Sequence, residues 1–292
     1  MRPLTPLLAL IALLVGLIGP ASAYAEAPAS FDANSAYVYV PPGVLQRAEP
    51  LQVVFALHGV GDEGKRFCQG LLSAADRNGW VVVAPTFKYR NWMDPAIVGE
   101  DDVALTGELD AMLDSMPNRL GHPVARRAML VGFSRGAQLA HRFALVYPDR
   151  TRAVAAVSAG SYTYPGKVLA GGGTEQVLDF PFGTADLEAR TGHPIDSTLL
   201  AGIPFWIAVG GADREPQDVP RQWDAIFGVT RVDRAAAFEQ SLEAAGVPAS
   251  LTVFPGVGHG MAPEMEKGAA SFLEEVTQPL VPEATAGHPA AV

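Results

Sequence analysis

Ser134 lies in the segment Gly132-Phe133-Ser134-Arg135-Gly136, whose residue types suit nucleophilic catalysis. The apolar run 128–132 before it is typical of a strand, and residues 135–147 have the pattern of an amphipathic helix. A serine on such a tight strand-to-helix turn projects its hydroxyl above the sheet, and the two glycines allow the backbone segments to approach closely. The pattern predicts that Ser134 is a nucleophile. The alternative, a serine that only caps the helix, leaves both glycines unexplained.

A serine hydroxyl needs a base, and the base needs an acid that orients it. Catalytic sets built on this turn follow the chain order serine, acid, histidine. His259 directly follows the last expected strand and is the expected base, whereas His193 precedes any suitable acid. Asp213 follows the expected strand 204–209 and is the expected acid, with Asp218 as the second candidate.

The segment Leu57-His58-Gly59-Val60-Gly61 closes an earlier strand. Enzymes with this arrangement take one oxyanion-binding N–H from that loop and another from the residue after the nucleophile. We therefore expect the oxyanion hole to consist of the Val60 and Arg135 amides, with Gly61 as the substitute for Val60. His58 precedes the nucleophile in the chain, which favours a structural role in the turn.

The elements that must position these residues alternate along the chain between strands and helices. Expected strands cover residues 36–40, 52–57, 80–84, 128–132, 153–157, 204–209 and 250–254. Expected helices cover residues 65–78, 101–116, 135–147, 233–245 and 262–276, with Asp101 or Asp102 as the cap of the second. Continuous apolar strands separated by helices predict an α/β fold, with a mostly parallel sheet covered by helices on both faces.

The stretch 161–202 breaks this alternation and is too long for an ordinary connection. We expect a small insertion here, placed after the sixth strand, that forms a cap or a substrate-binding loop; a merely decorative insertion is the alternative. Its aromatic side chains Tyr162, Tyr164 and Phe182 are the expected lining of an acyl or aryl pocket. They could equally be anchors of the core or of the loop.

The N-terminal residues 1–23 have the features of an export signal: a positive start, an apolar run and the small-x-small sequence Ala21-Ser22-Ala23. We expect cleavage after residue 23, although two later sites also fit, and an uncleaved anchor is the alternative. The catalytic domain is then expected over residues 24–278. Residues 279–292, which are rich in proline, alanine and glycine, are the expected flexible tail.

Composition narrows the classes of partner. The chain of 292 residues is 49% hydrophobic and carries a formal net charge of -10, which argues against nucleic acid and anionic membranes as partners. Cys68 is the only cysteine, so no disulfide within the chain is possible. No cofactor or metal is expected, because the chemistry requires none and no metal-ligand spacing occurs. The oligomeric state is left open.

Taken with the motifs above, the sequence resembles the α/β-hydrolase superfamily over roughly residues 35 to 277. It is most similar to the secreted polyhydroxybutyrate depolymerase, feruloyl esterase and dienelactone hydrolase-like group, on the segments Glu100-Asp101-Asp102 and Tyr147-Pro148-Asp149. Arg135 departs from that group, which often has a small or neutral residue there. A dienelactone hydrolase would carry cysteine at the position of Ser134.

The resemblance and the motifs together imply a secreted or periplasmic serine esterase that acts on a small-molecule or polymeric ester through an acyl-enzyme. No membrane contact is expected after the signal is removed. Two other functions stay open, namely a serine peptidase with the same three residues and a non-catalytic binding protein of the same fold. Acyl chain length and the natural substrate are not indicated by the sequence.

Overall fold

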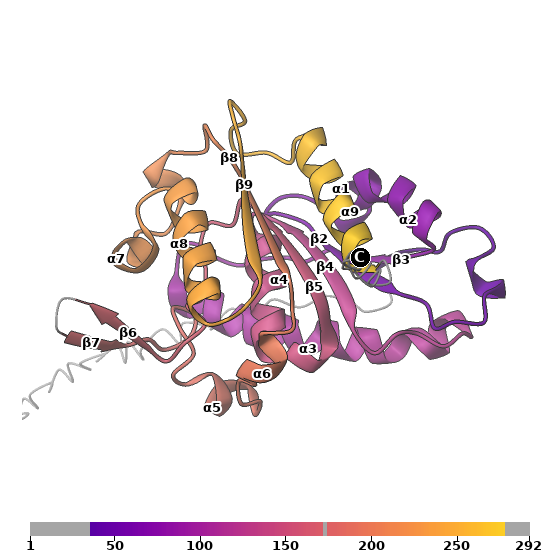
Figure 1. Ribbon diagram of the computed structural model, residues 1–292, viewed down its shortest axis with the longest axis horizontal. Coiled ribbons are helices and arrows are strands. Elements are labelled where there is room, and N and C mark those ends of the chain that lie inside the picture. The colour runs from indigo at the N-terminus through magenta and orange to yellow at the C-terminus, as the bar shows by residue number, and fades with distance from the viewer. Residues whose placement is uncertain (1–35, 172–173, 278–292) are drawn as a thin grey trace, which may run out of the picture.

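The computed structural model describes residues 36–171 and 174–277 (Figure 1). Their main sheet has seven strands in the order β1-β3-β2-β4-β5-β8-β9. β1 pairs antiparallel with β3, and every other pairing in this sheet is parallel. The expected mostly parallel α/β sheet is therefore confirmed. The strands are β1 (Tyr37–Tyr39), β2 (Val53–Leu57), β3 (Val81–Ala84), β4 (Ala128–Phe133), β5 (Thr151–Val157), β8 (Phe205–Gly210) and β9 (Ala249–Phe254).

Helices cover both faces of this sheet. The longer α-helices are α2 (Leu72–Asn78), α3 (Pro95–Leu120), α4 (Arg135–Val146), α8 (Arg231–Ala244) and α9 (Pro263–Thr277). The shorter ones are α1 (Gly64–Phe67), α5 (Leu187–Thr191), α6 (Ser197–Leu200) and α7 (Asp224–Phe227). One face packs against α3, α4 and α8, and the other against α1, α2 and α9. No helix among the described residues combines the length and apolarity that a membrane crossing requires.

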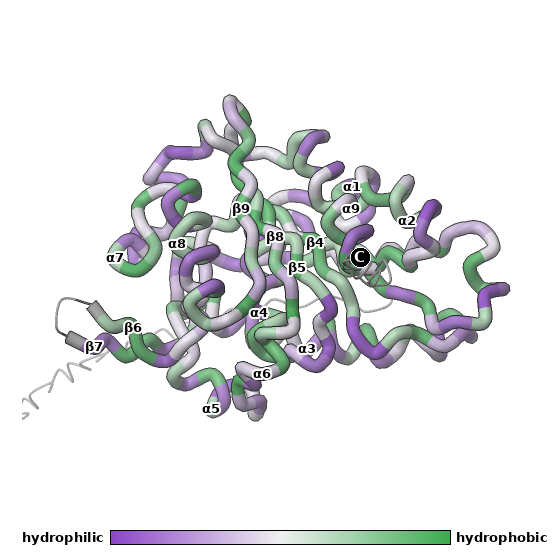
Figure 2. The backbone as a smooth tube through the Cα atoms, viewed as in Figure 1, coloured by the Kyte–Doolittle hydropathy of each residue, from purple (hydrophilic) through white to green (hydrophobic). Residues whose placement is uncertain are grey.

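Strands β2, β3 and β8 are buried throughout and apolar because both of their faces are covered, whereas the edge strands β1 and β9 are partly exposed. Along β2, for example, Phe55 and Leu57 belong to the cluster under α3 and α4, whereas Val54 and Ala56 belong to the cluster under α2 and α9. This alternation follows from the two-residue repeat of a strand. Figure 2 shows the hydrophobic residues concentrated along the central strands. The sheet is thus a rigid platform from whose ends the loops project.

Helix α3 begins earlier than expected. Asp94 caps it, accepting a hydrogen bond from the Ala96 N–H at 2.9 Å, and Pro95 occupies the first helical position. Asp101 and Asp102, the expected caps, lie inside the helix and are buried. The prediction was wrong because it followed the apolar periodicity, which begins only at Val103, and overlooked the Asp-Pro start signal.

The insertion over residues 161–202 follows β5, the fifth strand of the described chain, and not the sixth as expected, because each of the five apolar runs before residue 161 forms one strand. It contains the antiparallel hairpin of β6 (Val168–Gly171) and β7 (Thr174–Val177), which projects from the body of the molecule, and the helices α5 and α6 (Figure 1). The expected signal at residues 1–23 and the tail at 279–292 lie outside the described residues.

Candidate active site

Ser134 sits on a strained turn between β4 and α4. Its backbone has φ 53° and ψ -113°, a combination that costs about 1–3 kcal/mol for a residue other than glycine. The flanking glycines leave no room for side chains. A Cβ atom on Gly136 would lie 2.0 Å from the Leu57 carbonyl oxygen, and one on Gly132 would lie 2.3 Å from the Gly136 carbonyl oxygen. The turn therefore brings β2, β4 and α4 into close contact beneath the serine.

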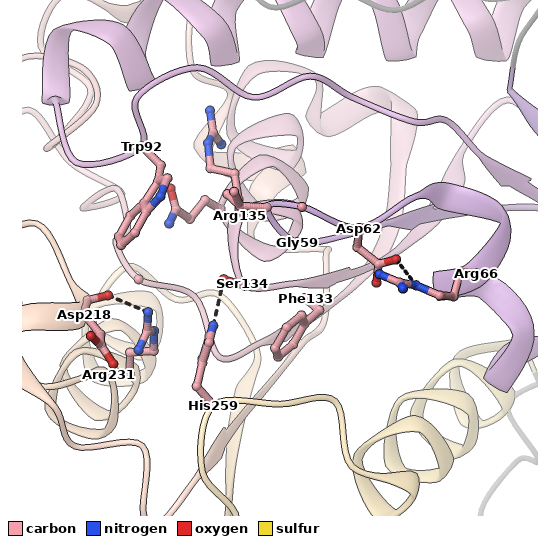
Figure 3. Close-up of a pocket in the computed structure, with 14 residues that line it drawn as sticks. Gly59, Asp62, Arg66, Trp92, Phe133, Ser134, Arg135, Asp218, Arg231 and His259 are labelled. Atoms are coloured by element: carbon pink, nitrogen blue, oxygen red, sulfur yellow. Dashed lines mark hydrogen bonds and ion pairs between the residues drawn. The ribbon is translucent and has the colours of Figure 1, made fainter.

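His259 contacts Ser134, and Asp213 contacts His259. Both residues follow the ends of neighbouring strands. His259 follows β9, and its Nε2 lies 3.1 Å from the Ser134 Oγ. Asp213 follows β8, and its Oδ2 lies 2.8 Å from the His259 Nδ1. The three residues thus form one hydrogen-bonded line at the carboxyl end of the parallel strands. Figure 3 shows the imidazole of His259 directed at Ser134.

The imidazole is further oriented by its neighbours. Phe133 stacks on the His259 ring, with centroids 5.0 Å apart and planes inclined by 27°. Because Asp213 can only accept from Nδ1–H, the other nitrogen, Nε2, is left with its lone pair toward the Ser134 hydroxyl. The arrangement can therefore take the hydroxyl proton when the serine oxygen attacks an electrophile.

Asp213 is held as a carboxylate by its surroundings. Burial alone would raise the pKa of Asp213, but the hydrogen bond from His259 and the charge of Arg231 outweigh it, and the pKa is lowered. Arg231 donates from Nη1 to Asp213 Oδ1 at 2.8 Å. The second candidate acid, Asp218, is exposed and uses its backbone carbonyl oxygen to accept from Arg231 at 2.6 Å. His193 lies beside Tyr147, with ring centroids 4.7 Å apart.

A pocket of about 420 Å³ opens over Ser134 (Figure 3). Val60, Gly61 and Arg135, the expected oxyanion residues, line it together with Ser134 and His259. The Arg135 N–H is the first of α4 and so belongs to the amides that have no partner within the helix. This end of a helix also carries partial positive charge, which favours an anionic oxygen.

The aromatic residues expected to line the pocket lie elsewhere. Tyr162 is fully buried and stacks on Phe238, with centroids 4.3 Å apart. Phe182 packs on Trp223 at 4.5 Å, and Tyr164 packs against the same hydrophobic core. None of the three lines the pocket. The three aromatic residues are instead anchors of the core and of the loop, because α8 and the segment before it cover this part of the insertion.

Other side chains line the pocket instead, and the sequence motifs did not single them out for it. They are Asp62, Arg66, Trp92, Gln138, Asp218 and Arg231. Trp92, Asp218 and Arg231 lie on one side of Ser134, and Asp62 and Arg66 lie on the other (Figure 3). Gln138 was identifiable, because it lies one helical turn after Ser134 on α4. Arg231 follows no local motif and depends on the packing of α8.

Arg135 has a buried side chain with a structural partner. Its guanidinium Nη1 lies 2.7 Å from Asp102 Oδ1, and the group stacks over the Tyr89 ring at 5.0 Å. The contact with Asp102 is an ion pair without hydrogen-bond geometry. Figure 3 shows the side chain directed away from His259. The resembled esterases often have a small or neutral residue at this position. The packing of Arg135 behind the turn explains the difference.

Neither histidine of the buried core is available as a base. The Nδ1 of His58 contacts the Gly59 carbonyl oxygen at 2.6 Å, and its Nε2 accepts from the Phe87 N–H at 2.9 Å. His141 makes the same pair of contacts with Ala137 and Thr163.

Within the described residues, no group of three or more histidine, cysteine, aspartate or glutamate side chains could hold a metal ion.

The architecture of this chain is similar to that of several solved structures. No family model and no curated protein matches the sequence. Among solved structures, poly(aspartic acid) hydrolase-1 from Sphingomonas sp. KT-1 is similar, with 20% identity, a TM-score of 0.62, and coverage of 82% of this chain and 92% of that one. Esterase PE8 has 20% identity, a TM-score of 0.55, and coverage of 86% and 100%.

The carboxylesterase of Bacillus cereus has 14% identity and a TM-score of 0.52, and the match covers 82% of this chain and 93% of that one. The structural similarity establishes the architecture. Because the identities are this low, the activity of this chain has to be argued from its own residues. The parallel sheet, the helices on both of its faces and these similarities lead to one conclusion. The chain has the α/β-hydrolase fold.

Proposed function

We propose that this protein is an exported serine hydrolase that cleaves carboxylic esters through Ser134, His259 and Asp213. The observation that carries the proposal is the continuous hydrogen-bonded line from Asp213 through His259 to the Ser134 hydroxyl, at the floor of a pocket. The strained backbone at Ser134 supports it, because such strain persists where the surrounding structure enforces a particular geometry.

In the first half of the reaction, the Ser134 Oγ attacks the ester carbonyl carbon while His259 Nε2 takes the hydroxyl proton. The imidazolium is stabilised by Asp213. The carbonyl oxygen becomes an oxyanion, which the Arg135 and Val60 amides bind, and each such donor contributes about 3–4 kcal/mol. Collapse expels the alcohol, which leaves with the proton from His259, and the acyl group stays on Ser134.

In the second half, water replaces the alcohol. His259 Nε2 takes a proton from the water as its oxygen attacks the acyl carbon, and the collapse of the second oxyanion releases the acid. The proton then returns to the Ser134 Oγ. This cycle consumes one water for each ester bond and needs no redox step.

The finer assignment, to the polyhydroxybutyrate depolymerase, feruloyl esterase and dienelactone hydrolase-like group, is supported by the sequence motifs around residues 100–102 and 147–149. Export is supported by the signal-like residues 1–23. N-terminal sequencing of the protein recovered from outside the cytoplasm should begin at or shortly after Tyr24. Recovery of an intact N-terminus would contradict export with cleavage.

The experiment that tests the reaction compares p-nitrophenyl esters of increasing acyl length with peptide p-nitroanilides, for wild type and for Ser134→Ala. The proposal expects ester hydrolysis by wild type and a loss of about four orders of magnitude or more in kcat for the variant. Preference for the anilides would instead indicate a peptidase. Equal rates for the two folded proteins would exclude Ser134 as the nucleophile.

A further inference from the structure

Arg231 stands directly behind the acid of the proposed site. It is the first residue of α8, it is only 4% exposed, and it donates from Nη1 to Asp213 Oδ1 at 2.8 Å. The other carboxylate oxygen, Oδ2, faces His259 Nδ1 at the same distance. Each oxygen of Asp213 is therefore committed to a different partner. A rotation of the carboxylate that served one partner less well would also weaken the other.

Arg231 is itself anchored, so it can fix what it binds. Its Nη2 donates to the Asp218 carbonyl oxygen at 2.6 Å, which ties the loop after β8 to the start of α8. Thr230 and Asp233 form a capping box at that start, where the Thr230 hydroxyl accepts from the Asp233 N–H and the Asp233 side chain accepts from the Thr230 N–H. The guanidinium thus projects from a well-defined helix end.

We propose that Arg231 is a positioning residue, which holds the Asp213 carboxylate in the orientation that accepts the hydrogen bond from His259. This inference rests on the proposed function. It assigns to Arg231 an effect on the chemical step through Asp213, not a contact with substrate. In serine proteases, an acid residue that no longer orients the histidine correctly lowers kcat by about four orders of magnitude, so its orientation matters.

A competing role follows from the fact that Arg231 also lines the pocket, where a guanidinium could bind an acidic substrate. The geometry disfavours it. Both terminal nitrogens are engaged with Asp213 and Asp218, and Nε, which has no hydrogen-bond partner within the described part of the chain, is buried. Asp218, whose negative charge would repel an anion, also lines the pocket.

The chain offers a matched control one turn along the same helix. Arg234 is fully buried and donates to the carbonyl oxygens of Gly160 and Pro220 and to the Asp224 carboxylate. Like Arg231, it holds the segment between β8 and α8, but its hydrogen bonds do not include Asp213. Loss of Arg234 therefore reports what a buried arginine of α8 contributes to the structure alone.

The test measures kcat and KM for p-nitrophenyl acetate, with active sites counted by titration with a fluorophosphonate so that unfolded molecules do not contribute. Arg231→Gln should lower kcat by about tenfold or more with KM within about twofold. Arg231→Lys, which keeps the charge but offers no fork, should recover part of the loss. Arg234→Gln should retain kcat within about threefold per active site.

A double-mutant cycle tests whether Arg231 acts through Asp213. Because Arg231 acts through Asp213, Arg231→Gln should cost less than about threefold in kcat when it is added to Asp213→Asn. Losses that multiply in the double variant, a raised KM with unchanged kcat, or equal losses for Arg231→Gln and Arg234→Gln would each overturn the inference. Wild type that neither hydrolyses esters nor reacts with the fluorophosphonate would instead overturn the proposed function.

Discussion

At the scale of single residues, the region behind the proposed nucleophile is unusually rich in buried charge. Asp102 lies between two arginines, with its Oδ1 2.7 Å from Arg135 Nη1 and its Oδ2 2.6 Å from Arg142 Nη1. All three side chains are at most 1% exposed. Arg142 also donates to the hydroxyls of Ser161 and Thr163, which connects α4 to the start of the insertion. One carboxylate thus compensates two cations next to the turn that carries Ser134.

Asp102→Asn is expected to lower the free energy of unfolding by about 3–5 kcal/mol, because it leaves two buried guanidinium groups without a counter-charge. Chemical denaturation with urea measures this. The control is Asp114→Asn, whose carboxylate is 67% exposed in its pair with Arg150 and whose loss should cost less than about 1 kcal/mol. Similar costs for both variants would show that the Asp102 cluster is not a stabilising unit.

The buried histidines make stability depend on pH. Burial, with the charge of Arg142 as the next cause, lowers the pKa of His141 well below its ordinary value, and burial also lowers the pKa of His58. A second proton on His141 would place an N–H against the Thr163 N–H, which now donates to Nε2 at 3.1 Å. The folded state therefore holds these rings neutral, whereas the unfolded chain protonates them near pH 6.5.

Since the folded-state pKa is the lower one, this stabilisation is fully present above about pH 6.5 and is lost progressively as the pH falls below it. We expect the free energy of unfolding to be smaller at pH 5.5 than at pH 7.5, and His141→Gln to reduce that difference. Urea titrations at the two pH values measure both effects. A His141→Gln variant whose stability changes with pH as much as that of wild type would contradict the neutral assignment of this ring.

At the scale of elements, the strand-turn-helix of β4 and α4 leaves no room for a side chain at its glycines. Gly136→Ala should destabilise the protein by about 1–3 kcal/mol or more, because its Cβ would lie 2.0 Å from the backbone oxygen of Leu57. Gly107→Ala on α3 is the control. Its Cβ would meet nothing closer than 3.7 Å, so it should stabilise by about 0.5–1 kcal/mol.

Thermal unfolding of both variants, followed by circular dichroism, checks this pair of opposite shifts. A Gly136→Ala protein as stable as wild type would mean that β2 and α4 can separate without cost. The close packing at the turn would then be no constraint, and the positive φ of Ser134 would need another explanation.

The sheet and the proposed triad could be predicted from the sequence because both depend on local patterns. Strands are apolar runs, and Ser134, Asp213 and His259 each follow such a run. The start of α3 carries a local signal too, Asp94-Pro95, but the apolar periodicity of the helix begins only at Val103 and indicates a later start. The insertion aromatics could not be placed in the same way. Tyr162 packs on Phe238, and its carbonyl accepts from the Trp223 indole, so its position depends on segments far along the chain.

Arg231 shows the same limit at the site itself. Its contact with Asp213 joins residues from the loop after β8 and from the start of α8, which are separated by 18 positions. No spacing rule predicts that the first residue of a helix will turn back toward a preceding strand end. Only the docking of α8 on the sheet brings the two charges together.

At the scale of the whole molecule, the order β4-β5-β8-β9 in the sheet brings the proposed catalytic residues together. Ser134 and His259 are 125 positions apart in the chain, and each follows the carboxyl end of a parallel strand. In open α/β sheets this edge is where ligands bind. The pocket over Ser134 lies there, between the loop at Val60 and the start of α8.

Ser134 is thus expected to be the one activated serine at this edge of the sheet. The most direct measurement treats the folded protein with a fluorophosphonate and locates the adduct by mass spectrometry of its peptides. We expect one phosphonyl group, on Ser134, none on Ser134→Ala, and labelling slowed by about two orders of magnitude or more in His259→Ala. Folded wild type that remains unlabelled, or that carries the adduct on another residue, would contradict it.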